Sequence, residues 1–430
     1  MRNSDLLIIF LAKAIRTFGF GYISVITAMY LAELGFSAIA IGAVLTATLI
    51  EDAVLTSTIA VIAHRVGVKV LLMAAPVMVV LAGLTLGLAH DPWIIAIAAV
   101  IGIISPAGQE GGPFSALEQA LIPGLVSRDH LTRTFSWYNI AGFVPSAFGA
   151  LAAGLWLDAA DKLGLSHLDG YRALFLLYAA SGLLLAVLYA FLKAKLATGT
   201  PKESATKPPS GSAAEPPADK AAEPPQPEKK LGLHRSRRHV FELSALFAVD
   251  SFAGGFVVQS MIVYWFHLRY HVGAEELGPL FFATNILAGF SFLLAPRIAA
   301  RIGLLKTMLV THLPCSIALA LIPLMPTYAA AAWLMIARSL FSSMDVPTRQ
   351  TYTMVLVADD ERPAAASFMA SARSVAQGLA PIFAGMTMAG AASGLPFYIA
   401  GSLKSIYDLT IYARFRKVPL EQHEGDQAGT

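Results

Sequence analysis

Twelve long stretches of mostly apolar residues constrain the fold of this 430-residue chain more than any other feature. A helix needs about 20 such residues to cross the hydrocarbon core of a bilayer, whereas a strand of a membrane barrel needs about 10 with alternating polarity. The length of the stretches therefore predicts an all-α integral membrane protein with twelve transmembrane helices. They lie at residues 5–31, 37–62, 68–89, 92–122, 132–156, 171–194, 240–266, 276–298, 304–325, 328–356, 363–389 and 393–415.

The composition excludes several classes of protein. Hydrophobic residues make up 56% of the chain and charged residues only 14%, against roughly a quarter in ordinary soluble domains. The single cysteine, Cys315, excludes a disulfide framework and a multi-cysteine metal site. A net charge of +3 without a long basic face argues against a nucleic-acid partner. We predict no metal and no cofactor.

Residues 197–239 separate the sixth and seventh stretches and have a different composition. They contain eight of the 24 prolines and no aromatic residue, so they lack the apolar surface that a packed core needs. We predict a disordered cytoplasmic linker with a basic end. The expected organisation is a six-helix bundle (1–196), the linker, a second six-helix bundle (240–417) and a flexible cytoplasmic tail (418–430).

The distribution of Lys and Arg predicts the orientation. With both termini in the cytoplasm, the cytoplasmic segments hold 22 of the 31 basic residues and the outer loops hold three. Cytoplasmic loops are enriched in basic residues, so this asymmetry predicts cytoplasmic N- and C-termini. We expect a multi-pass protein of the cytoplasmic (inner) membrane that acts as a monomer, with the lipid bilayer as its surroundings.

The two halves repeat short motifs in matching register. An Arg-x-Gly turn followed by Lys comes after the second and the eighth stretch, and Glu118-Gln119 and Arg349-Gln350 each precede a charged loop by about nine residues. Two repeated six-helix bundles predict a binding site near the middle of the membrane, at their interface. The loop residues are Arg65, Gly67, Lys69, Arg301, Gly303 and Lys306.

These paired turns resemble the loop signature of the major facilitator superfamily, and the resemblance covers the chain outside the linker. Residues 114–120 and 345–350 also look like an uncharacterised prokaryotic branch near the drug and solute antiporters. In this sequence His64 stands where the family has Asp. The resemblance implies two pseudo-symmetric bundles, in which the first, fourth, seventh and tenth spans line a central cavity.

Thirteen ionisable residues lie inside the predicted spans, where each costs about 2.5–3.5 kcal/mol at a helix centre and therefore normally faces a cavity or a partner. Eight are in the four spans that the resemblance assigns to the cavity. The thirteen are Lys13, Arg16, Glu51, Asp52, Glu110, Glu118, Asp250, Arg338, Asp345, Arg349, Arg373, Lys404 and Asp408.

The tenth span carries the clearest pattern. Helical periodicity places Arg338, Asp345 and Arg349 on one stripe, and Pro347 is expected to interrupt the helix between the last two. Two arginines for one acid favour contact with an anionic solute. The alternative is an ion pair within the helix that only neutralises buried charge. Glu118 and Arg16 are further candidates for the cavity wall.

Two carboxylates are candidates for proton coupling. Asp250 has no basic neighbour on its helix, and Glu110 is flanked by glycines. Burial disfavours a carboxylate's charge, which suits a group that binds and releases protons. The alternative for each is a permanent salt bridge to an arginine of another helix.

Other charged groups are interpreted as structural or gating pairs. Lys13 and Arg16 are expected to face Glu51 and Asp52 on the next span, either as mutual neutralisation or as a gate that opens during transport. Lys404 and Asp408, four residues apart, are expected to pair, and Arg373 to serve a cavity acid or a carbonyl. His312 and Cys315 are expected to pack in the core.

The leading functional hypothesis is a secondary transporter that moves a small organic solute, anionic or amphiphilic, by alternating access. The chain contains no phosphate-binding loop, so protons are the expected energy source. Export is favoured over the alternative, import of a nutrient or a metal chelate. A membrane-embedded enzyme lacks support, since no H-E-x-x-H or G-x-S-x-G motif occurs. A receptor that binds a solute without transporting it is a further alternative.

Overall fold

A computed structural model describes residues 2–108, 112–193, 236–357, 361–388 and 394–416. All regular structure among these residues is helical, which confirms the all-α prediction. Within these described residues, eight helical segments are long and apolar enough to cross a membrane. The linker prediction falls mainly on residues outside the described ones, as do the predicted tail and Glu110.

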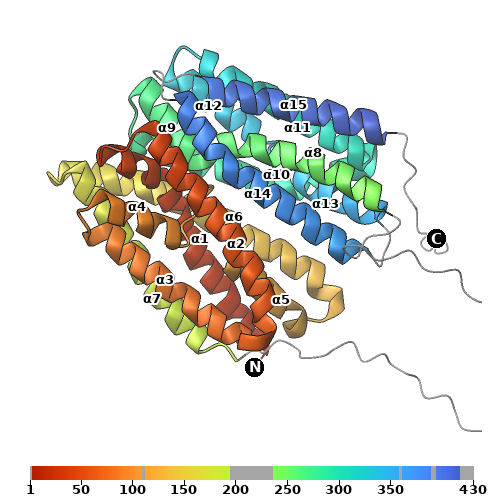
Figure 1. Ribbon diagram of the computed structural model, residues 1–430, viewed down its shortest axis with the longest axis horizontal. Coiled ribbons are helices and arrows are strands. Elements are labelled where there is room, and N and C mark those ends of the chain that lie inside the picture. The colour runs from red at the N-terminus through yellow and green to blue at the C-terminus, as the bar shows by residue number, and fades with distance from the viewer. Residues whose placement is uncertain (1, 109–111, 194–235, 358–360, 389–393, 417–430) are drawn as a thin grey trace, which may run out of the picture.

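The helices of the two sequence halves gather on opposite sides of the molecule, red to yellow-green against green to blue in Figure 1. The first half contains α1 (Arg2–Glu33), α2 (Ala38–Val66), α3 (Val68–Leu88), α4 (Pro92–Ile101), α5 (Pro113–Leu125), α6 (Arg128–Lys162) and α7 (His167–Ala190). The second contains α8 (Arg237–Phe256), α9 (Gln259–Tyr270), α10 (Ala274–Ile302), α11 (Leu304–Leu321), η1 (Ile322–Leu324), α12 (Tyr328–Ser339), α13 (Asp345–Leu356), α14 (Arg362–Met388) and α15 (Leu395–Phe415).

Three predicted spans are broken helices rather than continuous ones. The stretch 92–122 becomes α4 and α5, the stretch 240–266 becomes α8 and α9, and the stretch 328–356 becomes α12 and α13. In the first of these, Gly108 and Gly112 have φ of 67° and 92°, a conformation that glycine adopts without strain. These are the fourth, seventh and tenth spans. Such breaks are tolerated in a membrane where the backbone is buried in protein or lines a polar cavity.

The repeated loop motif has a structural reason in its glycines. Gly67 ends α2 with φ of 92°, and Gly303 ends α10 with φ of 84°. Each glycine donates its amide to a carbonyl one turn earlier, at Ala63 and Ala299. The positive φ ends one helix and allows the next to begin directly, which explains the same turn in both halves.

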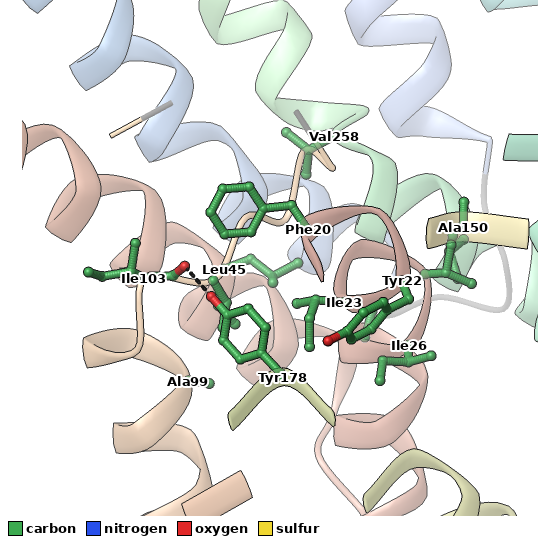
Figure 2. Close-up of a cluster of buried hydrophobic side chains, with 14 of the residues drawn as sticks. Phe20, Tyr22, Ile23, Ile26, Leu45, Ala99, Ile103, Ala150, Tyr178 and Val258 are labelled. Carbon is green, nitrogen blue, oxygen red and sulfur yellow. Dashed lines mark hydrogen bonds between the residues drawn. The ribbon is translucent and has the colours of Figure 1, made fainter. Parts of the chain in front are cut away.

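The halves meet along α2 with α14, α6 with α10 and α1 with α9. Small residues permit this approach: a Cβ on Gly42 would lie 2.3 Å from the carbonyl oxygen of Pro381, and one on Gly385 would lie 2.3 Å from that of Ala38. Figure 2 shows Val258, at the break of the seventh span, beside the buried cluster around Phe20 in the first half.

Within the described residues, every hydrogen bond between the halves lies toward the membrane face that carries the loop 34–37. Gln259 Nε2 donates to Ser24 Oγ at 2.8 Å, and Ser260 Oγ donates to the Ser24 carbonyl at 2.8 Å. The Ile382 amide donates to Thr46 Oγ1 at 2.9 Å. The fourth bond joins the Ser260 amide to a carbonyl of the first half. The bundles are therefore closed against each other at this end.

Candidate solute-binding cavity

A polar cavity of about 300 Å³ lies where the three broken spans interrupt their helices. Its wall includes Ala107 from the break before α5, Val257 from the break before α9, and Ser342 and Ser343 from the break before α13. Because helix breaks free backbone groups from intrahelical bonding, they supply polarity in the middle of an apolar protein.

The freed backbone groups at the breaks are bonded to other elements. The Ser260 amide at the start of α9 donates to the Pro106 carbonyl of the first half at 3.0 Å. The Ser343 amide donates to Ser291 Oγ of α10 at 3.2 Å, and Ser146 Oγ of α6 donates to the Gly108 carbonyl. The breaks are thus fixed parts of the structure that hold the cavity open.

Asp250 lies in the cavity wall between two cations from other helices. Its Oδ2 accepts a hydrogen bond from Arg349 Nη1 at 3.0 Å, and its Oδ1 accepts one from Lys404 Nζ at 2.7 Å. Asp345 Oδ2 lies 3.2 Å from the same Arg349 nitrogen. Asp250 therefore forms a salt bridge to other helices, which is the predicted alternative to a proton carrier. The neighbouring cations stabilise its ionised carboxylate.

Two further arginines line the cavity without a carboxylate partner among the described residues. Arg338 Nη1 contacts the sulfur of Met335 at 3.6 Å, and its buried Nε has no hydrogen-bond partner. Arg373 Nε donates to the hydroxyl of Ser251 at 3.1 Å. Both belong to the cavity wall. A guanidinium in such a place retains donors for an anionic ligand.

The predicted stripe of the tenth span requires a correction. Arg338, Asp345 and Arg349 all line the cavity, but residues 340–344 separate α12 from α13, so no continuous helix aligns them. Pro347 does not interrupt a helix. It lies in the first turn of α13, where an amide has no intrahelical partner and proline is therefore tolerated.

His312 is buried but contacts two carboxylates, so the prediction that it only packs in the core is wrong. Its Nδ1 lies 2.7 Å from Asp408 Oδ1, and its Nε2 lies 3.7 Å from Asp250 Oδ1. The predicted pair of Lys404 with Asp408 is also wrong, since Lys404 contacts Asp250 and Asp408 contacts His312. An isolated histidine in a sequence carries no signal for such a contact, because its two partners come from other helices.

The cluster also resembles a metal site in one respect. Single ligand atoms of Asp250, His312 and Asp345 lie within 4.8 Å of one another. The same carboxylates, however, contact Arg349 and Lys404. A metal cation there would meet a guanidinium and an ammonium at its own ligands, so the surrounding charge disfavours a metal.

The first half contains a separate buried ion pair. Arg16 of α1 and Glu118 of α5 form two hydrogen bonds at 3.0 and 2.9 Å, with exposed fractions of 1% and 0%. The hydroxyls of Tyr138 and Tyr189 donate to the same carboxylate at 2.7 and 2.5 Å. Arg16 therefore pairs with Glu118 rather than with Glu51 or Asp52, which corrects the predicted gate.

The other members of the predicted gate lie apart. Lys13 Nζ lies 3.3 Å from the centre of the Tyr138 ring, a cation–π contact. On α2, Glu51 and Asp52 form no ion pair with Lys13 within the part of the chain that the structure describes. Asp52 faces Gly112 at the start of α5, where a Cβ would lie 2.3 Å from its Oδ1.

A second compartment of about 240 Å³ continues the cavity toward the first half. The two compartments share Ser343 and Val346. The second is less charged, with amide, ammonium and aromatic groups from both halves: Lys13, Gln119, Asn139, Phe143, Phe292 and Gln350.

The sequence matches the model of the Major Facilitator Superfamily over residues 9–381, so the chain belongs to this family of membrane transporters. It is 24% identical over 430 residues to an uncharacterised membrane protein of Saccharomyces cerevisiae, covering 96% of this chain and 94% of that protein.

Solved transporters have the same fold. The nucleoside transporter NupG superposes with a TM-score of 0.69 at 13% identity, covering 96% of this chain and 99% of that one. The Escherichia coli xylose transporter XylE, in an inward open conformation, gives 0.68 at 15%, covering 99% and 98%. A bacterial homologue of the lysosomal transporter Spinster, also inward-facing, gives 0.67 at 16%, covering 96% and 98%.

Proposed function

We propose that this protein is a secondary transporter that carries a small organic anion across the cytoplasmic membrane by alternating access. The observation that carries the proposal is the pair Arg338 and Arg373, which line the cavity without a carboxylate partner among the described residues. The charges around them nearly balance, so these two guanidiniums leave the cavity positive. A solute anion supplies the missing charge.

The shape of the cavity favours a solute with two unlike ends. The charged compartment suits a carboxylate or phosphate group, and the compartment around Phe143, Phe292 and Asn139 suits an uncharged body with hydrogen-bonding atoms. NupG and XylE, which share the fold, are transporters of nucleosides and of xylose, which are polar bodies without an acid group.

The closed end of the cavity supports a cytoplasm-facing conformation. The hydrogen bonds between the bundles lie between the helix breaks and the loop 34–37, which the distribution of Lys and Arg places outside. With cytoplasmic termini, solute would reach this conformation from the cytoplasm. An importer releases its solute in this conformation, and an exporter binds it there. Because the coupling proposed next moves solute and proton in the same direction, an inward proton gradient drives import; import is the direction we propose, and export is the second candidate.

Protons are the proposed energy source, with His312 rather than Asp250 as the coupling group. With His312 charged, the three carboxylates of Asp250, Asp345 and Asp408 are matched by three bases: His312, Arg349 and Lys404. With His312 neutral, one negative charge is unmatched. A solute anion beside the cluster therefore favours the protonated histidine, which couples its binding to proton uptake.

Counterflow in proteoliposomes tests the transport claim. Vesicles are preloaded with one unlabelled organic acid from a panel and diluted into a trace of the same labelled compound. A carrier accumulates label transiently, because exchange is faster than net flow. The proposal fails if an acid stabilises the protein thermally but gives no counterflow, which is the behaviour of a receptor.

A further inference from the structure

A groove outside the transport cavity lies between the first turns of α1 and α6. It has a volume of about 540 Å³ and opens toward the surroundings of the helices. Its α1 wall consists of Leu6, Leu7 and Phe10, and the α6 wall includes Trp137. None of the groove residues belongs to the charged cluster or to the two compartments of the cavity.

The deep part of the groove is apolar. Leu7 is 60% exposed and Trp137 is 54% exposed, while Phe10 packs its ring edge-on against Tyr138 with centroids 6.0 Å apart. In a membrane protein, such exposed side chains face acyl chains rather than water. Tryptophan at the end of a span is typical of the membrane interface.

The outer part of the groove is basic. His130 and Arg133 lie in the first two turns of α6, both are exposed, and neither has a carboxylate partner among the side chains that the structure describes. The nearest acid on α1, Asp5, is turned away and accepts a hydrogen bond from the Lys193 amide at 3.1 Å. The positive end of the α6 dipole adds to this charge.

The basic part and the apolar part of the groove follow each other along α6, as the headgroup and the acyl chains do in a phospholipid. Trp137 follows Arg133 by four residues, which places it about 6 Å deeper along the helix axis. Because the basic outer end lies beside an apolar inner wall, we propose that the groove binds an anionic phospholipid of the leaflet nearest the termini. The phosphate contacts Arg133 and His130, and an acyl chain contacts Trp137, Phe10 and Leu7.

The chemistry discriminates between lipids. A phosphatidylglycerol headgroup brings one uncompensated negative charge to Arg133, whereas phosphatidylcholine also brings a quaternary ammonium that the guanidinium repels. One basic residue near an anionic lipid contributes a free energy that corresponds to about a fivefold change in affinity. A free phosphate ion uses the basic end but gains nothing from the apolar wall.

Fluorescence quenching by brominated lipids tests the site in the full-length protein. The protein is placed in phosphatidylcholine nanodiscs that contain increasing fractions of brominated phosphatidylglycerol or brominated phosphatidylcholine. The signal of Trp137 is isolated as the difference between the wild type and Trp137→Phe. We expect phosphatidylglycerol to quench Trp137 at lower mole fraction, and Arg133→Gln to raise the required fraction about fivefold.

A matched control is Arg301→Gln, which removes an exposed arginine from the last turn of α10, a helix that contributes no residue to the groove. It should leave the quenching of Trp137 unchanged. Equal quenching by both lipids in the wild type would overturn the proposal, as would equal effects of Arg133→Gln and Arg301→Gln. If Arg133→Gln does not fold, His130→Gln provides the second test, with a smaller loss in the same direction.

Discussion

Glu118 and Arg349 occupy matching positions in the two sequence repeats and form buried ion pairs of opposite polarity. Glu118 accepts from Arg16 of α1, the first span of its half, and Arg349 donates to Asp250 of α8, the first span of the other half. In each bundle, the ion pair therefore joins the first span to the fourth span. Only the second pair lies in the cavity, so the repeats share a structural link but differ in function.

Substitution of Arg338 should separate affinity from stability. Arg338→Gln removes a cation without a carboxylate partner in the described structure, so the unfolding temperature should stay the same or rise. The KM for an organic anion should rise about tenfold to a hundredfold, the value of a lost charge-assisted hydrogen bond. Proteoliposome uptake and thermal unfolding check this, with Arg301→Gln as control. A fall in stability together with an unchanged KM contradicts the assigned role.

Asp250→Asn should destabilise the protein. The substitution leaves Lys404 and Arg349 without one of their anions, and breaking a buried pair costs about 3–5 kcal/mol. Adding Lys404→Met should recover part of that loss, measured by chemical unfolding in detergent. If Asp250 is instead a proton carrier without a structural role, Asp250→Asn will lose coupling at unchanged stability and the double variant will recover nothing.

Substitution of His312 tests the coupling proposal. His312→Gln keeps a hydrogen-bonding side chain beside Asp408 but cannot bind a proton, so uptake of solute should no longer respond to an imposed pH gradient. Exchange of solute without a gradient should persist. Measurement of solute-driven pH change inside vesicles with a trapped dye checks this. Proton movement at the wild-type ratio in His312→Gln would assign coupling to another group.

Glycines at the seam between the halves should control the conformational equilibrium. A Cβ on Gly42 would collide with the Pro381 backbone, so Gly42→Ala should disfavour the closed contact of α2 with α14. Spin labels on the loop 34–37 and on α14 should then report a longer distance. Gly124→Ala is the control, because a Cβ there meets nothing within 4 Å. An unchanged distance in Gly42→Ala would mean that the seam tolerates the methyl group.

Much of the fold follows from the sequence because membrane insertion imposes a simple rule on length and polarity. The long apolar helices and the repeated glycine turns follow from local patterns, whereas the cavity position of Arg338, Asp345 and Arg349 follows from the resemblance to the transporter family. The pairing of charges does not. Arg16 and Glu118 are 102 residues apart, and His312 and Asp408 are 96 apart, so tertiary packing alone selects these partners.

The positions of the helix breaks do not follow from the sequence for a related reason. The stretch 240–266 has only the glycines before Gln259 as a sign of its interruption. In 328–356 the sequence predicts an interruption at Pro347, whereas the break lies at residues 340–344. In a membrane, such interruptions depend on partners elsewhere, here Pro106 and Ser291, that satisfy the freed amides.

Arg338 and Arg373, which have no carboxylate partner among the described residues, are proposed to select an anionic solute, and a pair of solutes that differ in charge tests this selection most directly. An organic acid that gives counterflow is compared with its neutral primary amide, in wild-type protein and in Arg338→Gln, by the concentration that half-saturates exchange. We expect a strong preference for the acid in the wild type and the loss of most of that preference in Arg338→Gln. Equal half-saturation by acid and amide in the wild type, or an undiminished preference in Arg338→Gln, would contradict it.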